Sequence, residues 1–62
     1  MRHNEFEDIC KEVRTGKEHR VKHIITHQVG KIIGCNLEDE FFEIDVDGEH
    51  KTWSKNNCQE LH

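Results

Sequence analysis

The sequence predicts a mainly β fold: a small, strongly bent, five-stranded antiparallel barrel behind a short N-terminal α-helix. Apolar residues near the start follow a helical period, and from about residue 19 onward they follow the two-residue period of strands. They are mostly Val, Ile and Phe, which fit pleated surfaces. Tight-turn signals then recur at short intervals. With 62 residues we expect one domain, 1–62, with the helix over 4–15 and the barrel over 19–61.

The segment NEFEDICKEVR indicates an amphipathic helix. Asn4 is an acceptable N-cap, and the acidic residues after it suit the positive end of a helix dipole. Phe6, Ile9 and Val13 form one stripe, and Gly16 suits the position just after a helix end. About eleven residues do not hold a helix in water alone, so this stripe is expected to dock on the sheet.

Two strands are expected next. RVKHIIT is rich in β-branched residues and predicts the first strand, which ends in a turn at His27 and Gln28. VGKIIGCN predicts the second strand, and the acidic run LEDE a connection.

A hairpin and a final strand follow. FFEIDV alternates, with Phe42, Ile44 and Val46 on one face. The pair Asp47-Gly48 predicts a two-residue type I′ turn. EHKTWS is the returning strand with Trp53 facing inward, and NNCQEL gives a tight turn and a last short strand anchored by Leu61.

The order HRVKHIIT, VGKIIGCNLED, FFEIDVDG, EHKTWS, NNCQEL resembles the SH3-like small barrels, including the KOW and Tudor-type modules, over residues 19–61. The resemblance implies a five-stranded barrel that acts as a binding module. An N-terminal helix ahead of such strands equally resembles the Sm-like fold, the alternative. The chain departs from a Tudor-type reader by offering few aromatic residues for a cage, and the basic loop of a KOW module is thin.

The composition favours a cytoplasmic protein. No apolar stretch follows Met1 as in a signal peptide, and no window approaches a membrane span. The cysteines, Cys10, Cys35 and Cys58, are odd in number and far apart, which is not typical of a secreted disulfide framework. We expect them to be isolated, small buried residues.

Charge is divided unevenly along the chain. Residues 1–35 hold seven Lys/Arg and five Asp/Glu, whereas residues 36–62 hold two and eight, within a formal net charge of −4. Such a chain could pair with itself or offer a basic face to an acidic partner. The net charge disfavours sequence-independent nucleic-acid binding.

The spacing of His19, His23 and His27 raises the question of a metal site. On a helix these side chains would share a face, but on the expected strand four residues span about 13 Å, too far for one zinc ion. We therefore expect no metal there. A zinc site assembled from distant cysteines and a histidine stays open as an alternative.

Other sites are less well supported. EIDVDG imitates the start of a calcium loop, but counting from Glu43 the twelfth position is Ser54 rather than glutamate. No catalytic pattern or phosphate-binding glycine loop appears, so we expect neither an enzyme nor a cofactor.

A protein-interaction module is therefore the expected function, with a protein partner or self-association and no membrane. Its binding surface is expected at Phe41, Phe42, Glu43 and Trp53. Phe41 is out of register with Phe42, so it either points outward or packs under the helix. The alternative is a nucleic-acid or ribonucleoprotein accessory that binds through the basic segment 17–31, with Lys17, Arg20, Lys22 and Lys31.

Overall fold

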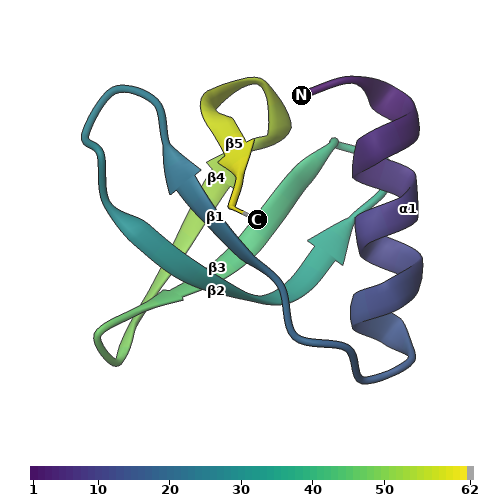
Figure 1. The fold of residues 1–62 in the computed structure, drawn as a ribbon, viewed down its shortest axis with the longest axis horizontal. Coiled ribbons are helices and arrows are strands. Elements are labelled where there is room, and N and C mark those ends of the chain that lie inside the picture. Colours follow the sequence, from purple (N-terminus) through teal and green to yellow (C-terminus); the bar gives the residue numbers. More distant parts are fainter. Residues whose placement is uncertain (62) are drawn as a thin grey trace.

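The computed structural model describes residues 1–61, which form one helix and a single five-stranded antiparallel sheet (Figure 1). The elements are α1 (His3–Arg14), β1 (Arg20–His23), β2 (Val29–Asn36), β3 (Phe41–Val46), β4 (Glu49–Ser54), the 3₁₀ turn η1 (Lys55–Asn57) and β5 (Cys58–Glu60). The strand order is β4-β3-β2-β1-β5, so β5 returns to pair with β1. The molecule measures 24 × 23 × 21 Å.

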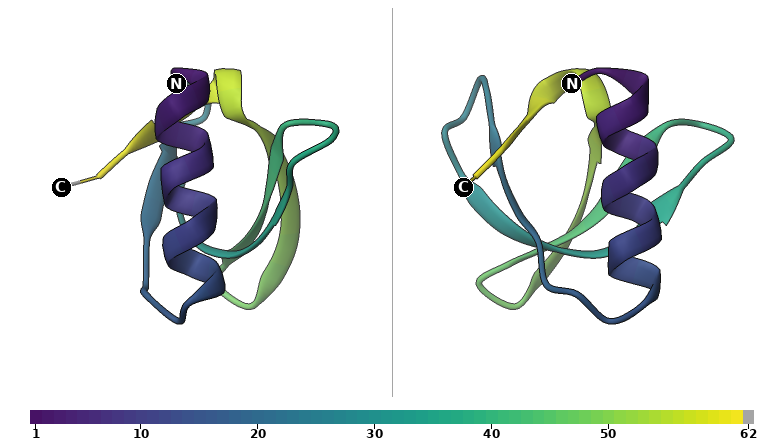
Figure 2. Two further views of the ribbon diagram at one scale, coloured as in Figure 1. Left: turned by 90° about the vertical axis from the view of Figure 1, so that its right-hand side faces the viewer. Right: turned by 45° about the vertical axis from the view of Figure 1, so that its right-hand side comes forward.

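The sheet is strongly bent but is not closed into a barrel by hydrogen bonds. Strands β4 and β5 are its two edges, and η1 connects them. Helix α1 lies across one side of the curved sheet, and the N-terminal end of the helix is close to η1 (Figures 1 and 2). The expected five antiparallel strands and N-terminal helix are confirmed, whereas full hydrogen-bonded closure is absent among the described strands.

Helix α1 begins earlier than its sequence predicts. The N-cap is Arg2, whose side chain makes no capping hydrogen bond, and the Phe6 amide donates to the Arg2 carbonyl at 3.1 Å. The prediction of Asn4 as N-cap is therefore wrong. A physical reason is that His3, inside the helix, lies one turn before Glu7 and contacts it at 3.0 Å. The end is as expected, since Gly16 has φ +97° directly after the cap residue.

The core lies between α1 and the face of the sheet turned toward it. Phe6 is fully buried and meets Phe42, with ring centroids 5.0 Å apart. The buried apolar residues are Phe6, Ile9, Cys10, Val21, Ile32, Phe42, Ile44, Val46, Trp53 and Cys58. The helical stripe and the inward position of Trp53 are confirmed, so burial of apolar surface between two layers holds the fold together.

Strand β1 is shorter than predicted. It ends at His23, whose Nδ1 accepts the amide N–H of Ile25 at 3.2 Å and of Thr26 at 3.3 Å. A side chain that captures these amides competes with the strand ladder, so the chain turns at residues 24–26. The prediction of a strand through Thr26 is wrong, and Ile24 and Ile25 are left 48% and 70% exposed in the turn.

The remaining hairpins match the sequence. Strands β2, β3 and β4 have the expected bounds. Asp47 and Gly48 have φ values of +51° and +89°, as a type I′ turn requires. Leu61 follows β5 but is 40% exposed, so its expected anchoring role is wrong.

Candidate functional site

The aromatic and acidic residues of the expected binding surface are divided between two faces of the sheet. Phe42 is 0% exposed and Trp53 6%, and both belong to the core. Phe41 is half-buried and Glu43 is exposed. Neighbouring residues of a strand point to opposite faces. Because Phe42 pairs with Cys35, which is bonded to the helix, Phe41 faces away from α1 and does not pack under it.

Three of the four basic residues singled out in the sequence come together. Arg20 of β1 lies directly opposite Lys31 of β2, and Lys22 points to the same side of β1. Lys17 precedes β1 and lies outside the strands; it forms an ion pair with Glu12 at 3.2 Å, as Lys31 does with Glu18 at 3.4 Å. The basic set is therefore a short cationic strip on β1 and β2, without Lys17.

We call the side of the sheet turned away from α1 the outer face. The strand register places on it Arg20, Lys22, Val29, Lys31, Phe41, Glu43, Asp45, His50 and Thr52. One row crosses four strands in the order Arg20, Lys31, Asp45, His50. Charge thus changes across the outer face, from cationic on β1 and β2 to acidic on β3. The uneven division of charge along the sequence reappears as an uneven division in space.

The three evenly spaced histidines do not share a site. His19 precedes β1, His23 ends it, and His27, with φ +62°, directly follows the turn at residues 24–26. The ring of His23 meets that of Trp53 edge-on, with centroids 5.1 Å apart. Among residues 1–61 no group of three His, Cys, Asp or Glu side chains is placed to hold a metal ion.

His19 joins the C-terminal end of α1 to the sheet. Its Nε2 lies 2.8 Å from Oε1 of Glu12 on α1, and its Nδ1 lies 3.3 Å from Oε2 of Glu60 on β5. Carboxylates only accept hydrogen bonds, so both contacts are hydrogen bonds when both ring nitrogens carry protons. The hydrogen bonds from Lys17 and then from His19 lower the pKa of Glu12 below its usual value.

A similar arrangement holds the N-terminal end of α1. His3 contacts Glu7 at 3.0 Å and Glu40, in the β2–β3 turn, at 2.9 Å. Glu40 also pairs at 3.1 Å with Lys55, an 11%-exposed side chain whose ammonium lies 5.8 Å from the centre of the Phe6 ring. The hydrogen bond from Lys55 is the largest cause of the lowered pKa of Glu40. Each end of α1 is therefore fixed by a histidine between two carboxylates.

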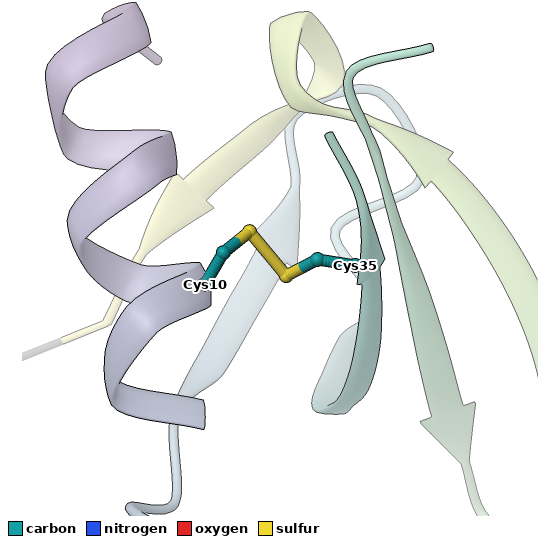
Figure 3. Close-up of a disulfide and its surroundings, with 2 residues drawn as sticks. All are labelled: Cys10 and Cys35. Atoms are coloured by element: carbon teal, nitrogen blue, oxygen red, sulfur yellow. A yellow bond between two sulfur atoms is a disulfide. The ribbon is translucent and has the colours of Figure 1, made fainter. Parts of the chain in front are cut away.

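A disulfide joins the middle of α1 to β2. Cys10 and Cys35 are 25 residues apart in sequence, and their Cα atoms lie 5.9 Å apart (Figure 3). The expectation of isolated cysteines is wrong for this pair and correct for Cys58, which is free and buried. Burial raises the pKa of the Cys58 thiol to about 11, so that thiol is protonated at neutral pH.

Sequence reasoning missed the disulfide because the two cysteines belong to different elements. A partial signal was present: Cys10 follows Phe6 by four residues, so it lies on the same helical face, which turns toward the sheet. Cys35 lies opposite Phe42, on the inward face. Only the docking of α1 on β2 brings the two sulfur atoms together.

Comparison with known proteins gives no relative. Within residues 1–61, no helix has the length and apolar character needed to cross a membrane. No protein-family model, no curated protein and no solved structure matches this chain.

Proposed function

We propose that the chain is a non-catalytic protein-binding module built on an open SH3-like barrel, with the Sm-like barrel as the alternative architecture. The path of the chain supports this proposal. Strands β1 to β4 pair in succession, a single 3₁₀ turn separates β4 from β5, and β5 returns to β1. This path brings the two edge strands toward each other, as in a small barrel that stops short of closure.

The observation that carries the functional proposal is the charge division of the outer face. Phe41 offers a half-buried ring beside the exposed carboxylate of Glu43, and the strip on β1 and β2 is cationic. A protein segment with basic and apolar side chains complements the Phe41–Glu43 end. A second copy of this chain carries such residues on its own β1 and β2, so self-association is one form of the proposed binding.

The cysteine chemistry favours a binding role over catalysis. Cys10 and Cys35 are joined to each other, and neither is a free thiolate. Cys58 is buried and protonated at neutral pH, which makes it a poor nucleophile. A cysteine–histidine nucleophile pair therefore has no suitable thiol among residues 1–61.

The test compares two chains that carry the same change of charge. Glu43→Lys alters the outer face, and Asp8→Lys makes an equal change on the exposed side of α1. We expect partners captured from an extract of the source cells by the wild-type and Asp8→Lys chains to be lost with Glu43→Lys. A purified partner should then shift the amide signals of β2 and β3. Equal capture by all three chains would contradict the proposed surface.

Nucleic-acid binding is the second candidate function, because Arg20, Lys22 and Lys31 gather on one face. It is tested by fluorescence anisotropy with single-stranded RNA and duplex DNA over a range of salt concentrations. Binding through this strip should weaken as salt rises and should be lost in the chain with Arg20→Glu and Lys22→Glu. The same changes at Arg2 and Lys11 on the helix side serve as control. No binding at low salt rejects this candidate.

A further inference from the structure

The disulfide lies beside a small groove between α1 and β2. The groove has a volume of about 180 Å³ and is lined by Cys10, Val13, Arg14, Ile33, Gly34 and Cys35. Figure 3 shows the two cysteines reaching across the gap between the helix and the strand. A register shift between Ile32 and Gly34 marks a bulge in β2, and Ile33 is 50% exposed there. The bulge places one wall of this groove at the surface.

Cys10 and Cys35 differ in how exposed they are to solvent. Cys10 is 3% exposed and belongs to the core, whereas Cys35 is half-buried at the edge of the core. Thiol–disulfide exchange requires an attacking thiolate to reach one sulfur, with the other as the leaving group. Because Cys35 is the more exposed residue of the pair, its sulfur is the one that we expect a thiolate to attack.

We propose that the Cys10–Cys35 disulfide is a thiol-exchange site for small anionic thiols of the glutathione class, with Cys35 as the residue that becomes modified. The thiolate forms a new S–S bond with Sγ of Cys35, and the Cys10–Cys35 bond breaks. Its electron pair leaves on Sγ of Cys10, which then takes a proton from water. A second thiolate then attacks the sulfur of the first small thiol in the mixed disulfide. This attack releases the two small thiols as one disulfide and releases Cys35 as a thiol. The net change is two thiols oxidised to one disulfide and one protein disulfide reduced to two thiols.

Arg14 gives the groove its preference for an anion. Arg14 lines the groove from the last turn of α1, and its side chain ends in a guanidinium, a group that binds carboxylates through paired hydrogen bonds. The groove is smaller than the roughly 300–1,000 Å³ of ordinary ligand pockets, so it suits the cysteinyl part of a small thiol.

The third cysteine does not compete for this reaction. Cys58 is buried, and its thiol is protonated at neutral pH because its pKa is about 11. Modification therefore leaves Cys10 as the released thiol rather than moving the disulfide to Cys58. After exchange, α1 keeps its core contacts and its two histidine–carboxylate contacts but loses its covalent bond to β2.

The experiment follows the reaction of the oxidised chain with glutathione and with cysteamine, a cationic thiol. Samples are quenched with acid, and the modified cysteine is located by peptide mass spectrometry. Rates are divided by those measured for an exposed model disulfide in the same buffer, which removes the intrinsic reactivity of each thiol. We expect the adduct on Cys35, a rate that rises linearly with thiolate concentration, and a preference for glutathione of roughly fivefold at low ionic strength.

Two variants make the test specific. Arg14→Gln should remove the preference for glutathione, whereas Lys11→Gln, which removes a cation from the same helix but outside this groove, should retain it. Cys58→Ala should leave the rates unchanged. An adduct on Cys10 would overturn the proposal. So would a rate that becomes independent of thiol concentration, because exchange would then await unfolding, and so would equal normalised rates for the two thiols.

Discussion

At the scale of single residues, Gly30 is constrained by the packing of the sheet. It lies opposite Val21 on the inward face of β2, and a methyl group built on it would overlap Cγ2 of Ile44. Gly30→Ala should therefore lower the free energy of unfolding by about 1–3 kcal/mol, measured by urea denaturation. Adding Ile44→Leu moves the branch away from Cβ and should recover part of that loss. If the losses in the free energy of unfolding from Gly30→Ala and Ile44→Leu simply add in the double variant, the overlap is contradicted.

The carboxylates at the two ends of α1 predict how stability depends on pH. The pKa of Glu12 and of Glu40 is lower in the folded protein than the usual 4.5. A lowered pKa contributes stability above 4.5 that is lost as the pH falls through the folded-state value. The melting temperature should therefore fall on acidification below about pH 4.5.

Glu12→Gln should reduce the fall in melting temperature at acidic pH, because a neutral amide does not titrate in that range. The control is Glu49→Gln, which changes the same type of residue at an exposed position on β4, away from α1. Thermal unfolding monitored by circular dichroism between about pH 2.5 and 7 measures both chains. An identical acid-side slope in wild-type and Glu12→Gln chains would contradict the role given to Glu12.

At the scale of elements, the disulfide is the covalent bond between α1 and the sheet. It closes a loop of 25 residues, for which the chain-entropy relation gives about 3.5 kcal/mol of stability. The chain with Cys10→Ala and Cys35→Ala should be less stable than wild type by roughly this amount, measured by urea denaturation. Reduction of the wild-type chain should give a similar loss, and Cys58 remains unaltered in both. A loss below about 1 kcal/mol would indicate that core packing alone docks the helix.

The elements also differ in how well the sequence predicts them. The hairpin of β3 and β4 follows from local information: a strict alternation, then Asp47-Gly48 with the backbone angles that this pair favours. The end of strand β1 is also set locally, by the ring of His23 accepting the amides of Ile25 and Thr26, but the alternation of apolar residues does not indicate this contact. The start of α1 includes His3, which contacts Glu7 one turn further along the helix and also Glu40, which is far away in sequence. The pattern of apolar residues predicts the elements, while individual side-chain contacts decide where they begin and end.

The same distinction applies to the candidate sites. Alternation along their strands places Glu43, Arg20, Lys22 and Lys31 on the outer face, where all but the half-buried Lys22 are exposed, so the sequence predicts their side of the sheet. Phe42 is an aromatic residue like Phe41, and the sequence predicts both for the binding surface. Phe42, however, lies on the face of the sheet that packs against α1, and it is buried there. The pairing of the cysteines and the histidine–carboxylate contacts require the packed fold and cannot be read from spacing.

At the scale of the whole molecule, the charge division of the outer face predicts weak, salt-sensitive self-association. Two copies related by a two-fold axis parallel to the central strand β2 bring the cationic strip of each against the acidic strip of the other, which consists of Glu43 and Asp45 on β3. Sedimentation velocity at rising protein concentration should show association at low salt and its loss at about 0.5 M salt, where screening acts within roughly 4 Å. This expectation depends on the outer face being the binding surface.

Paired charge reversals decide whether this geometry is right. One chain carries Arg20→Glu and Lys22→Glu, so both strips become acidic, and the other carries Glu43→Lys and Thr52→Lys, so the acidic strip becomes cationic. In a two-fold dimer of either variant alone, like charges meet at both contacts. Each variant alone should therefore associate at least about tenfold more weakly than wild type. An equimolar mixture restores opposite charges in both contacts and should associate again. A wild-type chain that stays monomeric at every concentration would exclude self-association, so the binding proposed for the outer face would then require a different protein.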